Sequence, residues 1–401
     1  MTFTNESQHL MKYFFNELEL FSGKKKKSNK FLKTLYKRYH HAIILYNKKY
    51  KYVIKKTIVD KYVDSDLMKG KYMDERCRDE IRMSKGVLKV KVNIEGVTIN
   101  LELMIFNNKD YNNLGKYDSY IEKSITFLIF LFSFIKNKKP SSITYYLYLT
   151  KYKKQLPSNR REILCGTNCN TGVTYGCTVN GRVLIYREEE WFKVLIHETF
   201  HMLCLDFNNM YLDNFNNEVR KMININSEYN LFESYTEFWA TYLNSVYCAT
   251  KLTGNIRNDK DFMLYFDFCI NYERVFSLFQ CVKVLNHMGL LYENLVSNEE
   301  ISKSLKNLHY KENTNVFAYY IIKTVILYFE DEFILWCKKN NSDVLNFTKN
   351  NESLHNFLSF IKKKINNVNL KKSIKIMEKI SKKLKGQVIK KSLRMTIINI
   401  N

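Results

Sequence analysis

Proline and glycine are scarce in this chain of 401 residues, which contains only 2 prolines and 12 glycines. Because both residues are the usual markers of turns, their scarcity implies few obligatory turns and favours a helix-rich fold. Long apolar runs are also missing. The longest one, residues 125–135, is too short to cross a bilayer, so no transmembrane segment is expected.

Acidic residues are too few to balance the basic ones. The chain contains 64 Lys and Arg residues but only 40 Asp and Glu residues, which gives a formal net charge of +24. A field of this sign attracts nucleic acid and anionic membrane surfaces. A lysine-rich, solvated surface has the same composition and is the simpler interpretation. We therefore predict no more than weak polyanion binding, through the basic ends of the chain.

Nine cysteines are present, an odd number spread along the chain. The start of the sequence lacks the charged residues and apolar run of a secretory signal. Both observations predict free thiols in a reducing, intracellular compartment. Cys165, Cys169 and Cys177 lie close together, but their spacing fits no standard zinc motif. We predict that these three are free buried thiols, with a second, structural zinc site as the alternative.

Alternation of apolar and polar residues marks the predicted strands. It indicates a β-hairpin over residues 86–107, with Glu95-Gly96 at its turn, and a further strand over 143–150. A second hairpin is predicted over 173–187, with Asn180-Gly181 as its two-residue turn, because this dipeptide is the strongest short hairpin signal.

Helices are predicted for most of the remaining chain. An apolar segment over 118–137 indicates a buried helix. The segment 188–205 indicates another, which opens with three glutamates that suit a helix N-terminus. A third is predicted over 229–250, followed by a mostly helical stretch over 262–345. In the lysine-rich tail, 361–394, five apolar residues share one helical face: Leu370, Ile374, Met377, Ile380 and Leu384. That face predicts packing on the domain, with a partner or a membrane surface as alternatives.

These patterns predict an α+β fold in three parts. A basic, mainly helical N-terminal region covers residues 1–80, a central domain covers 81–345, and a basic helical tail covers 346–401. In the central domain, a small twisted sheet is expected to pack against the helix over 188–205, and the C-terminal half is expected to be mainly helical.

The helix predicted over 188–205 contains a possible metal-binding motif, His197-Glu198-Thr199-Phe200-His201. Residues at i and i+4 of a helix point to the same side, so two imidazoles can bind one Zn²⁺ at about 2.0–2.1 Å each. Glu198 then lies beside the metal without binding it, where it can take a proton from water. Two histidines buried by chance beside an acid are the alternative, but an unpaired buried glutamate is costly.

Uncharged flanks around the motif, with Val194 three residues before His197, resemble the extended signature of zincin metallopeptidases. The preceding strand, RVLIYR, is similar to the edge strand that pairs with substrate in that family. The longer metzincin continuation is absent, because Cys204 and Phe207 stand where its Gly and His would be. The resemblance therefore indicates the gluzincin branch, and it implies a zincin-like fold with one Zn²⁺ per chain.

Gluzincins take their third ligand from a glutamate on a downstream helix, and the resemblance implies Glu233 for this role. Glu237, four residues later on the same face, fits the acid that orients a ligand histidine. The gap from His201 to Glu233 is longer than in several zincin families, although comparable to that in some clostridial neurotoxin proteases. Glu218, at the shorter spacing, is the alternative ligand, but its surroundings are polar and less helical in pattern.

An oxyanion stabiliser is expected after the third ligand, commonly a Tyr, His or Arg. Tyr319 and Tyr320 are predicted for this role, with His287 as a further candidate. The segments IHETFH and ESYTEFWA, together with the Lys- and Asn-rich composition, are also similar to uncharacterised metallopeptidase-like proteins of large DNA viruses. This second resemblance implies host cytoplasm or a virion as the location and indicates no substrate.

The sequence thus predicts a zinc-dependent peptide-bond hydrolase, in which His197, His201 and Glu233 hold the metal and Glu198 is the general base. Peptide or protein is the expected substrate. The main alternative is a catalytically inactive zincin-fold scaffold whose basic ends contact nucleic acid or membrane. The intact Glu198 counts against it, because a binding-only relic need not retain the base. A zinc hydrolase of a non-peptide bond is a second alternative.

Overall fold

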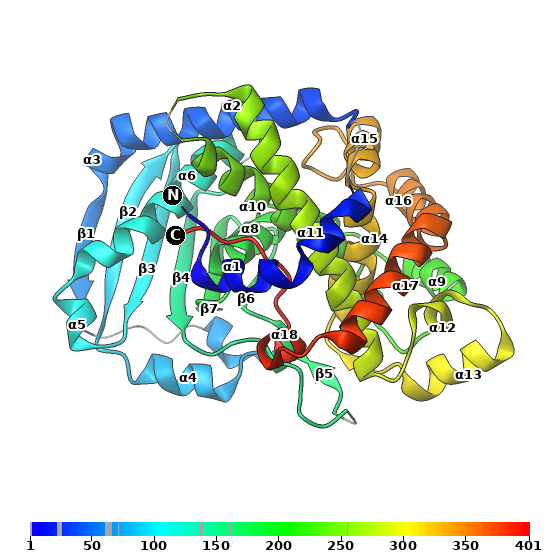
Figure 1. Cartoon of the computed structure of the whole chain (residues 1–401). Coiled ribbons are helices and arrows are strands. Elements are labelled where there is room, and N and C mark those ends of the chain that lie inside the picture. Colours follow the sequence, from blue (N-terminus) through cyan, green and yellow to red (C-terminus); the bar gives the residue numbers. More distant parts are fainter. Residues whose placement is uncertain are drawn as a thin grey trace.

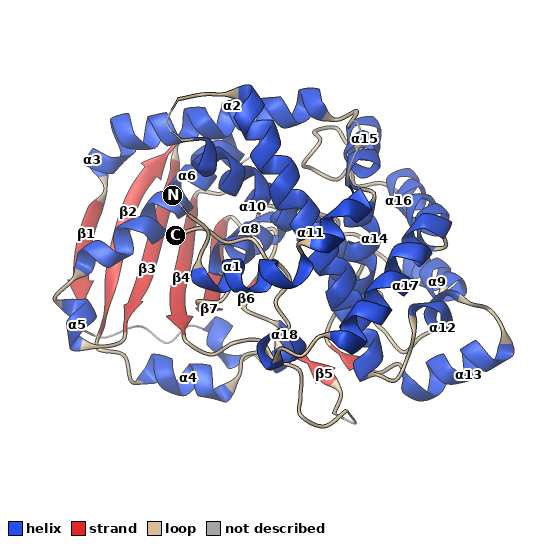
Figure 2. Ribbon diagram, viewed as in Figure 1, coloured by secondary structure: helices blue, strands red, loops and turns tan. Residues whose placement is uncertain are grey.

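The computed structural model describes residues 2–21, 26–60, 66–70, 72–135, 139–160, 162–254 and 256–401. In this part of the chain, a six-stranded mixed sheet lies at one side of a larger helical body (Figures 1 and 2). The predicted α+β class is confirmed. None of the described helices combines the length and the apolar character that a membrane crossing requires.

The main sheet has the strand order β1-β2-β3-β4-β7-β6. Its pairs are antiparallel except β3–β4 and β4–β7, which are parallel. The first predicted hairpin and the strand after it are confirmed, whereas β1 was not predicted. A separate two-stranded sheet joins β5 to β8. The strands are β1 (Lys55–Val59), β2 (Gly86–Ile94), β3 (Val97–Ile105), β4 (Ser142–Thr150), β5 (Leu164–Cys165), β6 (Gly172–Thr174), β7 (Asn180–Arg187) and β8 (Glu312–Asn313).

The second predicted hairpin exists as the β6–β7 pair, but the prediction of its turn was wrong. Asn180 and Gly181 begin β7 and pair with β4, and the turn is the longer loop 175–179. Two tertiary contacts override the local turn preference. The Oδ1 atom of Asn180 accepts a hydrogen bond from the Ser142 hydroxyl at 2.9 Å. A Cβ atom on Gly181 would lie 2.4 Å from the sulfur of Met202, so only glycine fits there.

The predicted helices are present, with shifted ends. The tail helix packs on α11 through its apolar face, as predicted. The helices are α1 (Asn5–Met11), α2 (Asn29–Leu45), α3 (Lys51–Val53), α4 (Glu75–Arg82), α5 (Asn108–Tyr111), α6 (Asp118–Phe132), α7 (Gly166–Cys169), α8 (Trp191–Met202), α9 (Asp213–Met222), α10 (Phe232–Thr253), α11 (Asp259–His287), α12 (Tyr292–Val296), α13 (Glu300–His309), α14 (Lys323–Tyr328), α15 (Glu330–Asn340), α16 (Asn351–Ile365), α17 (Val368–Lys383) and α18 (Gln387–Lys391).

The glutamates before α8 do not occupy its first turn, which corrects their predicted role. Glu190 precedes the helix in the left-handed conformation, with φ of 60°. Its buried carboxylate pairs with Lys154 and accepts the backbone N–H groups of Met395 and Thr396. The three glutamates therefore lie in the loop between β7 and α8. Through its contacts with Met395 and Thr396, Glu190 holds the C-terminal segment in place.

The C-terminal segment, residues 392–400, is not an exposed basic tail. It runs extended through the protein interior, and Ile397, Ile398 and Ile400 are buried. One hydrophobic cluster reaches from Leu10 to Ile400 and contains residues of all three predicted regions. The two chain ends also lie side by side, because the backbone N–H of Thr4 donates to the carbonyl of Asn399 at 3.0 Å (Figure 1).

Candidate metal centre

The helix α8 places the motif inside the protein. All twelve of its residues are buried, because one side contacts the sheet through β6 and β7 and the other contacts α10. Its apolar residues provide those contacts, and the polar side chains of His197, Glu198 and His201 border a common cleft. Buried polar groups need partners, so the surroundings of these three side chains define the chemistry of the site.

Three ligand-type atoms converge at this point. The Nε2 atoms of His197 and His201 are 3.0 Å apart, and each lies 3.1 Å from Oε2 of Glu233. This is the group of residues in the described chain that can hold a metal ion. A tetrahedral zinc site with bonds of about 2.0 Å has ligand atoms about 3.3 Å apart, close to the spacing found here.

The second nitrogen of each imidazole also has an acidic partner. Nδ1 of His197 lies 3.0 Å from Oε2 of Glu237, and Nδ1 of His201 contacts the carboxylate of Asp206. A neutral imidazole carries one proton, and a carboxylate partner holds it on the nitrogen that faces it. These carboxylates favour a proton on each Nδ1 atom, which leaves the two Nε2 atoms, beside Glu233, as the candidate metal donors.

Two lone pairs and a carboxylate oxygen facing one another repel unless a cation lies between them. Protons offer one solution. Burial by itself lowers the pKa of His201, but the charges of Glu233 and Asp206 outweigh it and raise that pKa well above its ordinary value. A divalent metal offers the other, and two imidazoles with one carboxylate are a donor set that zinc prefers. The residues present thus fit a metal ion.

The third candidate ligand and its support come from α10, which packs against α8. Glu233 and Glu237 are four residues apart, so both side chains reach the same face of α10. Burial alone would raise the pKa of the Glu233 carboxyl, but the adjacent histidines hold it well below its usual range. The other oxygen of Glu233 accepts a hydrogen bond from the amide of Asn315 at 3.1 Å, which fixes the carboxylate plane.

Glu198 lies between the two histidines in the chain and borders the same cleft. Burial holds the pKa of its carboxyl above the ordinary value, against the lowering effect of His197 and His201. The edge strand β6 makes room for it. A Cβ atom on Gly172 would lie 2.9 Å from Cγ and from Oε1 of Glu198, so this backbone approach requires glycine.

The cleft that contains these groups has a volume of about 520 Å³, within the usual range for ligand sites. Residues of β6 form one wall, and residues 313–315 with Tyr319 form another. Tyr319 belongs to a helical turn, Phe317–Ile322, and its ring centre is 6.0 Å from that of His197. No described lysine or arginine borders the cleft, although the net charge is +24, so its walls favour a cation.

Other residues predicted for the site lie elsewhere. Tyr320 is adjacent to Tyr319 but points away, and its hydroxyl donates to the carbonyl of Leu393 at 2.7 Å. The prediction that Tyr320 shares the role of oxyanion stabiliser with Tyr319 is therefore wrong, because successive residues of a helical turn face different directions. Glu218 is exposed on α9 and pairs with Lys221 at 2.7 Å, so it is no ligand. His287 contacts the carbonyl of Glu162 in a different cavity.

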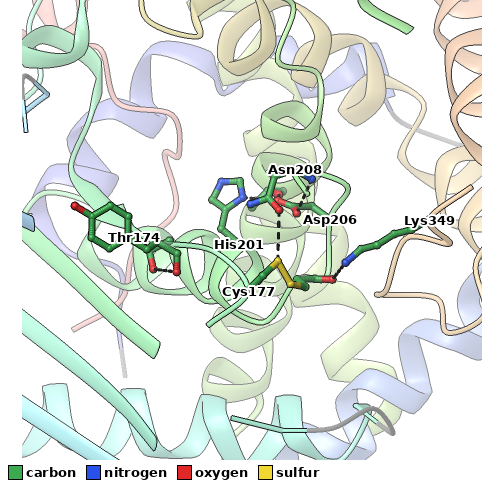
Figure 3. Close-up of a disulfide and its surroundings, with 9 residues drawn as sticks. Thr174, Cys177, His201, Asp206, Asn208 and Lys349 are labelled. Carbon is green, nitrogen blue, oxygen red and sulfur yellow. Dashed lines mark hydrogen bonds and ion pairs between the residues drawn. A yellow bond between two sulfur atoms is a disulfide. The ribbon is translucent and has the colours of Figure 1, made fainter. Parts of the chain in front are cut away.

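A disulfide joins Cys177 to Cys204, which corrects the prediction that Cys177 is free. It ties the loop between β6 and β7 to the residues just after α8 at a Cα–Cα distance of 5.1 Å. Figure 3 shows Asn208 contacting Cys177 and Lys349 contacting the carbonyl of Cys204. The other seven cysteines are free, as predicted. The disulfide removes part of the basis for predicting a reducing compartment.

Three functional residues were missed from the sequence: Asp206, Asn315 and Gly172. Asp206 lies five residues after His201, beyond the helix, where no helical spacing points back to the ring. Asn315 is distant in sequence from Glu233, and asparagine is so common in this chain that no single one could be selected from the sequence. A signal did exist for Gly172, because it directly precedes the hairpin predicted over 173–187, and a glycine at a strand often marks a close backbone approach.

No protein-family model matches this chain, and comparisons with curated proteins and with solved structures give no match either. Its chemistry is therefore inferred from the geometry alone.

Proposed function

We propose that the protein is a zinc-dependent peptide hydrolase of the zincin type, with one Zn²⁺ per chain held by His197, His201 and Glu233. One observation carries the proposal. Two Nε2 atoms and a carboxylate oxygen lie 3.0–3.1 Å from one another, while a carboxylate lies beside each Nδ1 atom and favours the tautomer protonated there. This tautomer leaves the Nε2 lone pairs for a metal.

A zinc ion in such a site supplies Lewis acidity toward water and toward a carbonyl oxygen. Glu198 is the general base: its carboxylate takes a proton from the attacking water and returns it to the nitrogen of the leaving amine. Tyr319, at the wall of the cleft, donates a hydrogen bond to the carbonyl oxygen as negative charge develops there. Glu237 and Asp206 keep the two imidazoles in place.

The edge strand β6 supports a peptide as substrate. It pairs with β7 on one side, and no described strand pairs with its other side. A strand edge beside a cleft can hold an extended peptide through backbone hydrogen bonds. In the zincins that the motif resembles, the edge strand has this role. The segment RVLIYR, predicted to be that edge strand, is instead part of β7 and pairs with both β4 and β6, so the edge strand beside the cleft is β6.

The first test separates metal binding from turnover. Purified wild-type protein is expected to contain about one zinc per chain by elemental analysis, and His201→Ala is expected to lose it. Glu198→Gln is expected to retain the zinc and to lose hydrolysis of a peptide library, with kcat lower by at least about 100-fold. Zinc in the wild type without any peptide turnover would favour the scaffold alternative. Unchanged turnover in Glu198→Gln would contradict the proposed base.

A further inference from the structure

A second cavity, of about 740 Å³, is larger than the cleft of about 520 Å³. It lies where α18 and the end of α17 meet the end of α11 and the loop that contains residues 156–160 (Figure 1). None of the residues around it borders the cleft of the metal centre. Five of them are cationic: Arg160, Lys283, Lys382, Lys390 and Lys391.

The positive charge of this cavity has no acidic counterpart. No described Asp or Glu borders it. Lys382, Lys390, Lys391 and Arg160 are exposed, and none of them forms an ion pair with a residue in the described ranges. The ends of α11 and α17 add partial negative charges of about half an elementary charge each. These offset about one of the five positive charges, so a strong net positive field remains.

The environment of Lys283 is a second, independent indication that this cavity binds an anion. Its side chain is buried, with 6% of the residue exposed, and its ammonium group donates to the carbonyls of Ile389, at 2.8 Å, and Ser392. An ammonium group has three donors, and Nζ of Lys283 also lies 4.8 Å from the centre of the Phe279 ring. No carboxylate contacts it among the described residues, and burial lowers its pKa well below the ordinary value, because burying a cation without an anion is costly. An anion in the cavity would supply the missing charge.

Neutral hydrogen-bond donors complete the walls. Asn286, Gln387 and two serines, Ser158 and Ser381, border the cavity beside the cations. Phosphate groups accept several hydrogen bonds at once and are the anions that clusters of Lys and Arg bind best. Five cations exceed the charge of one phosphate, and a volume of about 740 Å³ admits a drug-sized molecule.

We propose that this cavity, bordered by Lys283, Lys382 and Lys390, binds a small molecule that carries two or more phosphate groups. A compact ligand fits better than a nucleic acid, because the cations surround one concavity. Single-stranded nucleic acid is usually held along a groove with stacking aromatic rings. Among the described residues, the only aromatic side chain at this cavity other than His287 is the buried Phe279. This proposal does not depend on the peptidase activity.

The test uses the full chain and inorganic tripolyphosphate as the probe, measured by titration calorimetry at about 0.15 M salt. Saturable binding of about one probe per chain is expected. Charge reversal of the exposed lysines, in K382E/K390E/K391E, is expected to weaken it at least about tenfold. The matched control, K372E/K375E/K379E, changes three exposed lysines of α17 that do not border the cavity. It is expected to weaken binding less than about threefold.

Two further measurements keep the result interpretable. Because polyphosphates also bind zinc, the titration is repeated with His201→Ala, which is expected to bind the probe as the wild type does. Lys283→Met is expected to lose affinity for the probe, with its fold checked by circular dichroism. The proposal is overturned if tripolyphosphate does not bind, or if both triple variants weaken it equally. It is also overturned if a 12-nucleotide single-stranded DNA displaces the probe and binds more tightly.

Discussion

Lys193 and Glu237 form a buried ion pair of 2.6 Å directly beside the imidazole of His197. One oxygen of Glu237 contacts Nζ of Lys193 and the other lies 3.0 Å from Nδ1 of His197. The positive charge of Lys193 favours the ionised form of Glu237 against the effect of burial, and the ionised carboxylate favours a proton on Nδ1 of His197. The candidate metal ligand is therefore supported by a charge one helical turn before it on α8.

Breaking this pair should be costly. Lys193→Met is expected to destabilise the protein by about 3–5 kcal/mol, because it leaves a carboxylate buried without a counterion. The double variant Lys193→Met/Glu237→Gln should recover much of that loss, as measured by urea unfolding. Lys221→Met, which breaks an exposed pair with Glu218, should leave the stability close to that of the wild type. Equal effects of the two single variants would argue against a buried charge pair.

Gly172 is expected to position the general base. A methyl group at residue 172 would overlap Glu198, so Gly172→Ala should displace this carboxylate and lower kcat by about 10–100-fold with little change in bound zinc. Gly115→Ala is the control, because the atom nearest to a Cβ there, Oδ1 of Asn113, is 3.7 Å away. Peptidase kinetics and elemental analysis measure both effects. A loss of zinc in Gly172→Ala would instead indicate a general distortion of the site.

Asp206 is expected to set the affinity for the metal. It contacts Nδ1 of His201 and also accepts a hydrogen bond from the hydroxyl of Thr236 at 3.1 Å. Asp206→Asn should weaken zinc binding by about 10–100-fold, because a neutral amide holds the imidazole proton less firmly. Competition with a chromogenic chelator gives the dissociation constants. Asp79→Asn, an exposed substitution on α4, is the control and should leave the zinc affinity unchanged. If both variants bind zinc equally well, Asp206 does not support the metal site.

The stability of the fold should depend on pH through Glu273. This carboxyl is fully buried, and burial raises its pKa from 4.5 to about 7. Between these values the folded protein holds a proton that the unfolded chain releases, so stability falls as the pH rises. Over this range the loss amounts to about 3 kcal/mol.

Glu273→Gln should remove that part of the pH dependence. The amide oxygen can still accept the backbone N–H groups of Ile397, at 3.1 Å, and Ile398, at 2.9 Å. We expect the variant to be more stable than the wild type at pH 8 and to differ less at pH 5, by urea unfolding at each pH. Glu300→Gln, an exposed substitution, serves as the control. Identical pH slopes for Glu273→Gln and the wild type would show that residue 273 does not carry the effect.

The disulfide should stabilise the wall of the cleft. A cross-link between residues 27 positions apart is expected to contribute about 3 kcal/mol by restricting the unfolded chain. Cys177→Ser/Cys204→Ser should therefore unfold at lower urea concentration, and a reducing agent should shift the wild type in the same direction. The double variant should not respond to the reducing agent. Cys165→Ser, at a free cysteine, should retain the response of the wild type.

The sequence by itself determined the features that depend on neighbours along the chain. The spacing of His197 and His201 and that of Glu233 and Glu237 follow from the helical repeat, which is local. The hairpin at Glu95-Gly96 follows from alternation and turn chemistry, which are local as well. A fold of the α+β class, with its helix-rich C-terminal half, could be predicted on the same grounds.

Only the tertiary structure decided which distant groups meet. It places Glu233 rather than Glu218 beside the two histidines, brings Asp206 and Asn315 into contact with the candidate ligands, and joins Cys177 to Cys204. It also moved Asn180-Gly181 out of a turn and into a strand, because pairing with β4 and contact with Met202 outweigh a local preference. Such contacts depend on how elements pack across the core, and packing is not encoded in any short stretch of sequence.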